Sequence, residues 1–242
     1  MSLQELFITA ARLGFSSLDL TAYYIPGYPE VPVDEALYEI KRMAFRTGIS
    51  FSGTGVRNDF TLRDPEALAR EIDLVKRWIV VASKLGAPNI RVFDGKAPSS
   101  GDRASATHQQ VVDAFRECSR FGARHGVHVA FQNHHDYLKS TDEIIHIMQR
   151  VDSEWFGLML DTGSVVGSDP YLEIEKLIPY AVTWQVKETI RRGESWEELD
   201  VKRLVDLLHK HKYQGFLPIE TLGEGDPRKK VQALFQKVSA YL

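Results

Sequence analysis

The sequence has almost no cysteine, because Cys118 is the only one in 242 residues. A lone cysteine excludes an intramolecular disulfide, and this is typical of proteins from reducing compartments, so we expect a cytoplasmic protein. Cys118 lies in a segment of helical spacing, residues 111–118, and this position favours a buried, inert thiol over a nucleophile.

Long apolar runs and an excess of charge of one sign are missing as well. The apolar stretches are far shorter than the roughly 20 residues of a membrane span, and no secretory signal pattern opens the chain. The net charge is −3 with both signs interspersed, so we expect neither nucleic acid nor a membrane as a partner. With 43% apolar and 26% charged residues, the chain has the composition of an ordinary folded protein.

The sequence does contain a repeated alternation of short apolar strands and amphipathic helices. Asp64-Pro65 predicts a helix start, and Ser140 with Glu143 predicts a capping box. The predicted strands cover residues 16–21, 49–54, 89–94, a segment from 127 that ends in the polar run 132–136, 156–161, 182–187 and 215–220. The predicted helices cover residues 2–13, 33–47, 64–85, 103–125, a segment from 140, 170–180, 199–212 and a segment from 226 to the end.

Seven strands alternating with eight helices are the pattern of an α/β protein, a parallel (β/α)8 barrel of the TIM type. A doubly wound open sheet is the alternative. No linker interrupts the alternation, so we expect one domain over residues 1–242. The chain starts with a helix where such a barrel starts with a strand, which predicts that the first strand is absent. Strands 16–21 and 215–220 would then expose unpaired edges, which favour a covering segment or a homo-oligomer.

Side-chain alternation predicts which strand residues point into the barrel. The inward set is unusually polar for a barrel interior and clusters at C-terminal strand ends, which indicates a site. It comprises Asp19, Ser52, Arg91, Gln132, Asp161, Gln185, Lys187 and Glu220. Arg91 and Asp19 could equally form a buried ion pair. Two convergent carboxylates, Asp161 and Glu220, are unfavourable unless a cation joins them, which favours a functional role for both.

Six stretches of the chain resemble the xylose-isomerase-like barrel family of sugar (phosphate) isomerases and epimerases. They read Gly-Thr-Gly-Val-Arg-Asn-Asp-Phe at 53–60, Ala-Pro-Asn-Ile-Arg-Val-Phe at 87–93, Gln-Asn-His at 132–134, Gly-Leu-Met-Leu-Asp-Thr-Gly at 157–163, Gln-Val-Lys-Glu at 185–188 and Pro-Ile-Glu at 218–220. Together they span nearly the whole chain, apart from the missing first strand.

The resemblance implies a divalent metal held by a Glu, an Asp, a His and a Glu at successive strand ends. In this sequence those four positions are Gln132, Asp161, Gln185 and Glu220. Gln185 is similar to the residue of the hydroxypyruvate-isomerase branch, whereas Gln132 removes one negative charge, so we expect weak metal binding. Oxygen ligands suit Mg²⁺ or Mn²⁺, and recruitment of His134 would favour Zn²⁺.

The resemblance also implies catalytic and substrate-binding residues. In the family the two metal-binding glutamates pass the proton, and Gln132 has no basic site, so Glu220 remains as a catalytic residue. His134 is the second catalytic candidate, as a base or a third ligand, although a merely hydrogen-bonding histidine fits the sequence as well. The predicted substrate contacts are Arg91, Asn133, Lys187, Glu188 and Arg191, the last two from a pattern similar to His-x-x-Glu-x-x-Arg of tagatose-type epimerases.

Other features of the pattern depart from the family or leave alternatives open. Ser164 stands where the family keeps the His of an Asp-x-x-His motif, and Arg191 could simply be exposed. A Schiff base at Lys187 is disfavoured, because Glu188 and a polar substrate offer simpler partners. A related zinc endonuclease is disfavoured too, because its site needs more His and Glu ligands and a positive surface.

The function implied by the resemblance is a metal-dependent isomerase or epimerase of a sugar, sugar phosphate or sugar acid, working by proton transfer through an enediolate. Gln132 and Ser164 motivate an alternative, a non-catalytic carbohydrate-binding barrel with a decayed metal site. A dehydratase or lyase on the same scaffold is a third hypothesis, because it shares the first proton abstraction. In each case the expected partner is a small carbohydrate.

Overall fold

The computed structural model describes residues 1–97, 104–134 and 136–242. By contacts the chain divides into two compact units. The first comprises Met1–Phe131 with Val151–Phe156, and the second comprises Gln132–Arg150 with Gly157–Leu242. The single domain predicted for residues 1–242 stays a prediction. The predicted helix start at Arg103 and His135 of the polar run lie outside the described residues.

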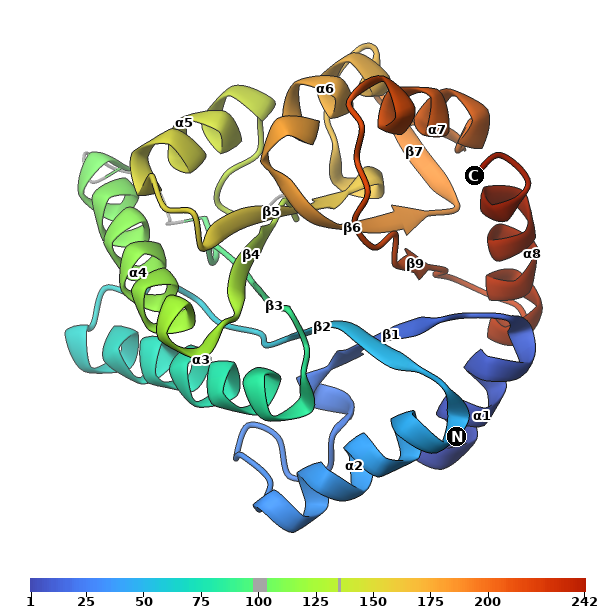
Figure 1. The fold of residues 1–242 in the computed structure, drawn as a ribbon. Helices are drawn as coiled ribbons and strands as arrows, with labels where there is room; N and C mark the ends of the chain where they lie inside the picture. The colour runs from blue at the N-terminus through green and yellow to red at the C-terminus, as the bar shows by residue number, and fades with distance from the viewer. Residues whose placement is uncertain (98–103, 135) are drawn as a thin grey trace. The chain divides into compact units, whose positions relative to one another are not determined.

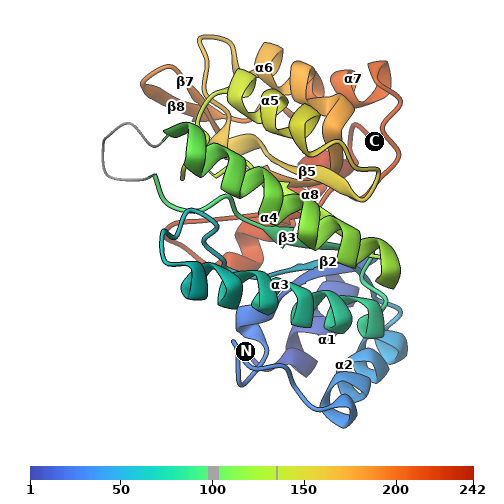
Figure 2. The same ribbon diagram turned by 90° about the vertical axis from the view of Figure 1, so that its left-hand side faces the viewer.

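The first unit follows the predicted alternation of strands and helices. Its elements are α1 (Leu3–Leu13), β1 (Ser17–Thr21), the 3₁₀ turn η1 (Ala22–Tyr24), α2 (Asp34–Thr47), β2 (Ser50–Gly55), α3 (Pro65–Leu85), β3 (Asn89–Val92), α4 (Ala104–His125) and β4 (His128–Gln132), of which Gln132 falls in the second unit. Its strands lie in the order β1-β2-β3-β4, and each pair is parallel. Helices α3 and α4 lie side by side (Figures 1 and 2).

Local sequence signals explain where these helices begin and end. Ser2 and Glu5 form a reciprocal capping box at α1, and the Asp64 side chain accepts a hydrogen bond from the Ala67 amide at α3. Gly14 follows α1 with a left-handed φ of 93°, which a residue without Cβ adopts without strain. The helix starts and stops predicted near these positions are therefore confirmed.

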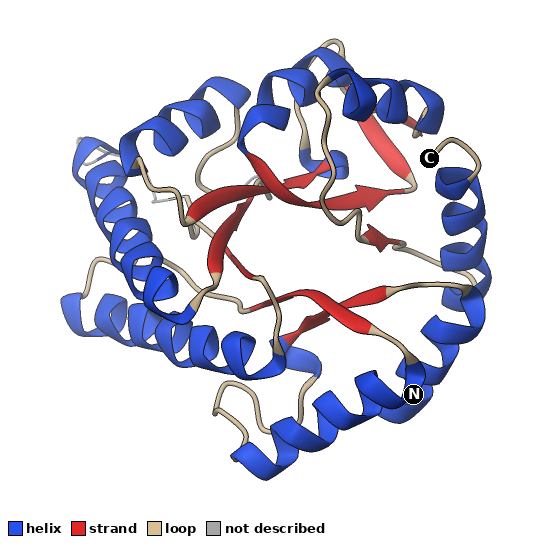
Figure 3. Ribbon diagram, in the orientation of Figure 1, coloured by secondary structure: helices blue, strands red, loops and turns tan. Residues whose placement is uncertain are grey.

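The second unit holds the remaining strand and helix repeats (Figure 3). Its elements are α5 (Thr141–Val151), β5 (Phe156–Asp161), the 3₁₀ turns η2 (Thr162–Ser164) and η3 (Ile178–Tyr180), α6 (Pro170–Leu177), β6 (Ala181–Lys187), β7 (Thr189–Arg192), β8 (Ser195–Glu198), α7 (Val201–Lys210), β9 (Ile219–Glu220) and α8 (Pro227–Ser239), with Val151 and Phe156 falling in the first unit. Strands β5, β6 and β9 are parallel neighbours in that order.

Two features of the second unit differ from the sequence prediction. The strand expected at 215–220 is reduced to Ile219–Glu220, because Pro218 has no N–H and joins the sheet only through its carbonyl, which accepts from the Val186 amide at 2.8 Å. An antiparallel hairpin of β7 and β8 was not predicted. Its turn contains Gly193 at a φ of 57°, but the many charged residues around it obscured the strand alternation.

Along the chain, seven parallel strands alternate with eight α-helices in the described residues, and the first element is a helix, as predicted. The apolar strand residues that alternate with the inward set face the helices and form part of the core. Leu20, Ile90, Val92, Leu158 and Leu160 are each at most 2% exposed. The alternate residues of the strands, which point away from the helices, can therefore carry polar side chains.

In the first unit, the polar residues predicted to point inward include Asp19 on β1 and Arg91 on β3, with β2 between the two strands. Asp19 Oδ2 is buried and has no hydrogen-bond partner among the described residues. Burial raises the pKa of Asp19, and attraction by Arg91 offsets this only in part. Arg91 instead donates to the Tyr23 hydroxyl at 3.2 Å and lies 4.6 Å from the ring centroid of Phe93.

We expect Asp19→Asn to stabilise the protein increasingly as the pH rises. Because the pKa of Asp19 is raised in the folded state, the folded protein holds the proton more tightly than the unfolded chain, and stability falls as the pH rises above the unfolded value of 3.8. The variant escapes this loss, and we expect a gain of about 1 kcal/mol at neutral pH. Urea unfolding of both proteins from pH 4 to 8 measures the difference, and a gain that shrinks with pH would contradict it.

Candidate functional site

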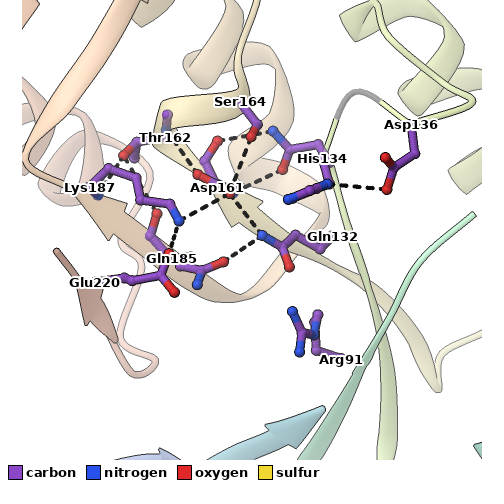
Figure 4. A network of polar contacts seen from close by, with 12 residues as sticks. Arg91, Gln132, His134, Asp136, Asp161, Thr162, Ser164, Gln185, Lys187 and Glu220 are labelled. Carbon is purple, nitrogen blue, oxygen red and sulfur yellow. Dashed lines mark hydrogen bonds and ion pairs between the residues drawn. The ribbon is translucent and has the colours of Figure 1, made fainter. Parts of the chain in front are cut away.

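A network of polar contacts surrounds Asp161 at the C-terminal end of β5 (Figure 4). The Asp161 residue is 1% exposed. Its Oδ2 accepts from Gln132 Nε2 at 2.8 Å and from Ser164 Oγ at 3.2 Å, and its Oδ1 accepts from the Gly163 amide at 2.9 Å. Both carboxylate oxygens are therefore held by donors, as a buried carboxylate requires.

The Asn133 side chain holds the backbone of Asp161. Its Nδ2 donates to the Asp161 carbonyl at 3.0 Å, and its Oδ1 accepts from the Asp161 amide at 2.8 Å. Both ends of the amide are used in this way, and Asn133 is 1% exposed. The residue predicted as a substrate contact therefore positions Asp161.

Gln132 and Gln185 join this network from β4 and β6. Gln132 is 2% exposed, and the Nε2 that donates to Asp161 also donates to Gln185 Oε1 at 2.5 Å. Three of the four positions that the resemblance assigned to metal ligands are thus linked directly by hydrogen bonds. The link passes through the amino group of Gln132, which a glutamate at this position would lack.

Lys187, the last residue of β6, connects Asp161 with the fourth position. Its ammonium forms an ion pair with Glu220 and lies 3.7 Å from Asp161 Oδ2. Lys187 and Glu220 are register partners in the parallel pair β6 and β9, and the Lys187 amide donates to Thr162 Oγ1 at 2.9 Å. The sequence placed Lys187 in the inward set but gave no sign that it would join the two carboxylates.

His134 lies beyond the end of β4, and its ring pairs with a residue that the sequence analysis missed. Nδ1 of His134 is 3.1 Å from Asp136 Oδ2, and the two side chains are 39% and 31% exposed. A carboxylate at this distance orients an imidazole ring for proton transfer. The only available signal was the spacing of the two residues in the polar run.

A cavity of about 680 Å³ opens beside this network. It is lined by His134, Asp161, Gly163, Ser164, Lys187, Glu188, Thr189, Trp196, Glu198, Glu220, Leu222 and Lys230. Glu188 is paired there with Lys230 of α8 at 3.1 Å. Trp196 is 61% exposed and belongs to β8 of the hairpin, which the sequence did not predict, so its place at the cavity was not predicted either.

Two arginines predicted as substrate contacts are not among the residues that line the cavity. Arg191 donates through Nε to the Gly193 carbonyl at 2.8 Å within the hairpin, and it is not among the residues that line the cavity. Arg91 belongs to the first unit, where it is 6% exposed. A substrate role for either stays a prediction.

Comparison with known families decides the class of this fold. A family model described as xylose isomerase-like TIM barrel matches residues 7–238. The chain belongs to this family. The predicted barrel class and the resemblance read from six short stretches are both confirmed. No curated protein matches the chain.

Solved structures similar to this xylose isomerase-like barrel include sugar epimerases. A 3-keto-D-glucoside 4-epimerase from E. coli is 14% identical, with a TM-score of 0.82 over 99% of this chain and 94% of that one. A D-psicose 3-epimerase from Clostridium cellulolyticum H10, solved with D-tagatose, is 16% identical, with a TM-score of 0.78 over 99% and 86%. A xylose isomerase-like TIM barrel protein from Mycobacterium smegmatis, in complex with magnesium, is 16% identical, with a TM-score of 0.75 over 99% and 89%. At these identities the likeness shows the fold.

The side chains of this barrel do not fit a divalent cation as they are arranged. Mg²⁺ and Mn²⁺ need several oxygen ligands, whereas the carboxylates of Asp161 and Glu220 face the ammonium of Lys187. Gln132 turns its amino group, which has no lone pair for a metal, toward Asp161. No group of three or more His, Cys, Asp or Glu side chains in the described part of the chain could hold a metal ion.

No described helix is long and apolar enough to span a membrane.

We expect Asn133→Ala to destabilise the second unit by about 2 kcal/mol, because two buried backbone groups of Asp161 lose their partners. Asn133→Asp keeps the acceptor for the Asp161 amide but loses the donor, and it adds a charge beside a carboxylate. It should therefore be at least as harmful. Urea unfolding of the purified variants measures both effects, and a change within experimental error for Asn133→Ala would show that Asp161 is held by other means.

Proposed function

We propose that the cavity binds a sugar or a close sugar derivative and that the protein catalyses proton transfer at the carbon next to the sugar carbonyl, as an isomerase or epimerase. One observation carries the proposal. A carboxylate, an imidazole and an ammonium, those of Glu220, His134 and Lys187, line the same cavity. The neighbours whose names include epimerases of D-psicose and of a 3-keto-D-glucoside agree with this class of substrate.

The proposed reaction assigns separate tasks to Glu220 and His134. Glu220 accepts the proton from the carbon next to the carbonyl, the C–H electron pair becomes the double bond of an enediolate, and negative charge develops on the carbonyl oxygen. In isomerisation, His134, oriented by Asp136, donates a proton to that oxygen and removes the hydroxyl proton at the carbon that lost its hydrogen, while Glu220 returns its proton to the former carbonyl carbon. In epimerisation the oxygen stays unprotonated, and a proton returns to the opposite face of the same carbon.

The amide of the buried Gln132 makes epimerisation harder to achieve than isomerisation. An amide has no basic site in this pH range, so Gln132 cannot serve as the second proton carrier that the resemblance assigns to its position. Inversion at one carbon needs a proton carrier on each face, so epimerisation requires that His134, which lines the cavity and pairs with Asp136, acts at carbon. Isomerisation needs only Glu220 on one face of the substrate.

Trp196 supplies the kind of surface that a sugar ring requires. It is exposed, it lines the cavity, and the flat indole ring packs against the C–H groups of a pyranose or furanose while hydroxyl groups face the polar residues. Glu188, paired with Lys230, lies in the same cavity and presents acceptors for hydroxyl groups.

A carbohydrate-binding protein without turnover is the second candidate. It is favoured by Gln132, which replaces a proton carrier, and by the ion pair that engages Glu220. The two candidates share the cavity and the stacking surface, and they differ only in whether bound sugar exchanges a proton.

We expect Glu220→Gln to lower solvent proton exchange into the sugar by about 100-fold or more, because the amide cannot accept the proton. The measurement is deuterium incorporation in D₂O, followed by NMR with a panel of ketoses and 3-keto-glycosides, which also identifies the product. Glu175→Gln is the matched control, because Glu175 does not line the cavity and pairs with Lys210, the last residue of α7, and with His211, which follows it. Binding without exchange in the parent protein would select the second candidate, and an active Glu220→Gln protein would reject Glu220 as the base.

We expect Trp196→Ala to raise KM about tenfold while changing kcat much less, because the ring contributes to binding of substrate and transition state alike. Tyr241→Ala removes another exposed aromatic side chain, 49% exposed, that does not line the cavity. Steady-state kinetics of both variants compare the two positions. Equal KM values for the parent and Trp196→Ala proteins would remove Trp196 from the binding surface.

A further inference from the structure

The ammonium of Lys187 lies where two acidic side chains converge. It is ion-paired with Glu220 and 3.7 Å from Asp161 Oδ2, and the side chains of Lys187 and Asp161 are 13% and 1% exposed (Figure 4). Two carboxylates this close to each other repel unless a cation compensates them. Here the chain itself provides the cation.

Strand pairing, a hydrogen bond and a close glycine fix the position of this lysine. Register pairing of β6 with β9 sets Lys187 beside Glu220, and the Lys187 amide is fixed by the Thr162 hydroxyl at 2.9 Å. The lysine stem passes over Gly163, where an added Cβ would lie 2.8 Å from Lys187 Cγ. Any larger residue at 163 would push the stem away from the carboxylates.

The remaining contacts of Asp161 suit a site that contains a lysine and no metal. Gln132 Nε2, Ser164 Oγ and the Gly163 amide all donate to the carboxylate. A glutamate at position 132 would face Asp161 as a second anion, whereas Gln132 is neutral and donates a hydrogen bond. Gln132 and Lys187 therefore act in the same direction, because each reduces the need for a divalent cation.

We propose that Lys187 replaces the divalent cation in this barrel, so that its ammonium both compensates Asp161 and Glu220 and provides the positive charge beside the substrate oxygen. The second part rests on the proposed function, whereas charge compensation does not. The site then works without a metal. The developing negative charge on the substrate oxygen is stabilised by a fixed ammonium, which needs no bound ion to be recruited from solution.

The test measures Mn²⁺ binding, which needs no turnover. Mn²⁺ is added to the parent protein, to Lys187→Met and to Lys187→Arg, and free Mn²⁺ is followed by EPR. We expect the parent and Lys187→Arg proteins to bind no Mn²⁺ tightly. Lys187→Met, which leaves two carboxylates without their cation, should bind Mn²⁺ about tenfold more tightly or better. Adding Gln132→Glu to Lys187→Met supplies a third carboxylate and should tighten binding again.

Lys230→Met is the matched control for Mn²⁺ binding. Lys230 lines the same cavity but pairs with Glu188, so its loss should leave Mn²⁺ binding at the level of the parent. Circular dichroism confirms that each variant is folded. If Lys187→Met unfolds, the Lys187→Met, Gln132→Glu protein refolded with and without Mn²⁺ answers the same question, because the proposal expects Mn²⁺ to restore its fold.

The outcomes separate this inference from the proposed function. Tight stoichiometric Mn²⁺ binding by the parent, or sugar exchange that EDTA abolishes and Mn²⁺ restores, would overturn the replacement of the metal while leaving the isomerase or epimerase in place. Gain of Mn²⁺ binding in Lys187→Met without any sugar exchange in the parent would support the replacement and reject the function. EDTA-resistant exchange in the parent, together with the gain in Lys187→Met, supports both.

Discussion

Attraction between one ammonium and two carboxylates organises the candidate site. Asp161 is almost completely buried, and a charge in that position is tolerated only when donors and a counter-charge surround it. Lys187 provides the counter-charge, while Gln132, Ser164 and Gly163 provide the donors. The strand ends of β5, β6 and β9 have to meet in the observed register for this to occur, so the chemistry of the site depends directly on strand pairing.

The sequence predicted the fold better than it predicted the roles of individual side chains. Periodicity, capping residues and glycines located the helices and the long strands, because these signals act over a few residues of chain. The hairpin of β7 and β8 was not predicted, since charged residues occupy half of its strand positions and its clearest turn signal is Gly193. The short β9 was overestimated because the consequence of Pro218 depends on its neighbour β6.

For the candidate site, strand parity identified Gln132, Asp161, Gln185, Lys187 and Glu220 as one inward group, and the structure brings all five together. Parity cannot say which atom of one side chain faces which atom of another. It therefore could not reveal that Asn133 uses both ends of its amide on the Asp161 backbone, or that Lys187 is the cation that two convergent carboxylates require. Such pairings depend on distances between strands that are far apart in the sequence, which only the folded structure fixes.

Trp196 and the ion-paired groups of Asp161, Lys187 and Glu220 line the cavity from separate elements of the second unit. Trp196 comes from the hairpin, while the carboxylates and the ammonium come from the ends of β5, β6 and β9. Residues in the hairpin can therefore change without disturbing the ion pairs. Under the proposed function, selectivity for one sugar over another can therefore diverge in the hairpin while the groups proposed to transfer the proton are inherited unaltered.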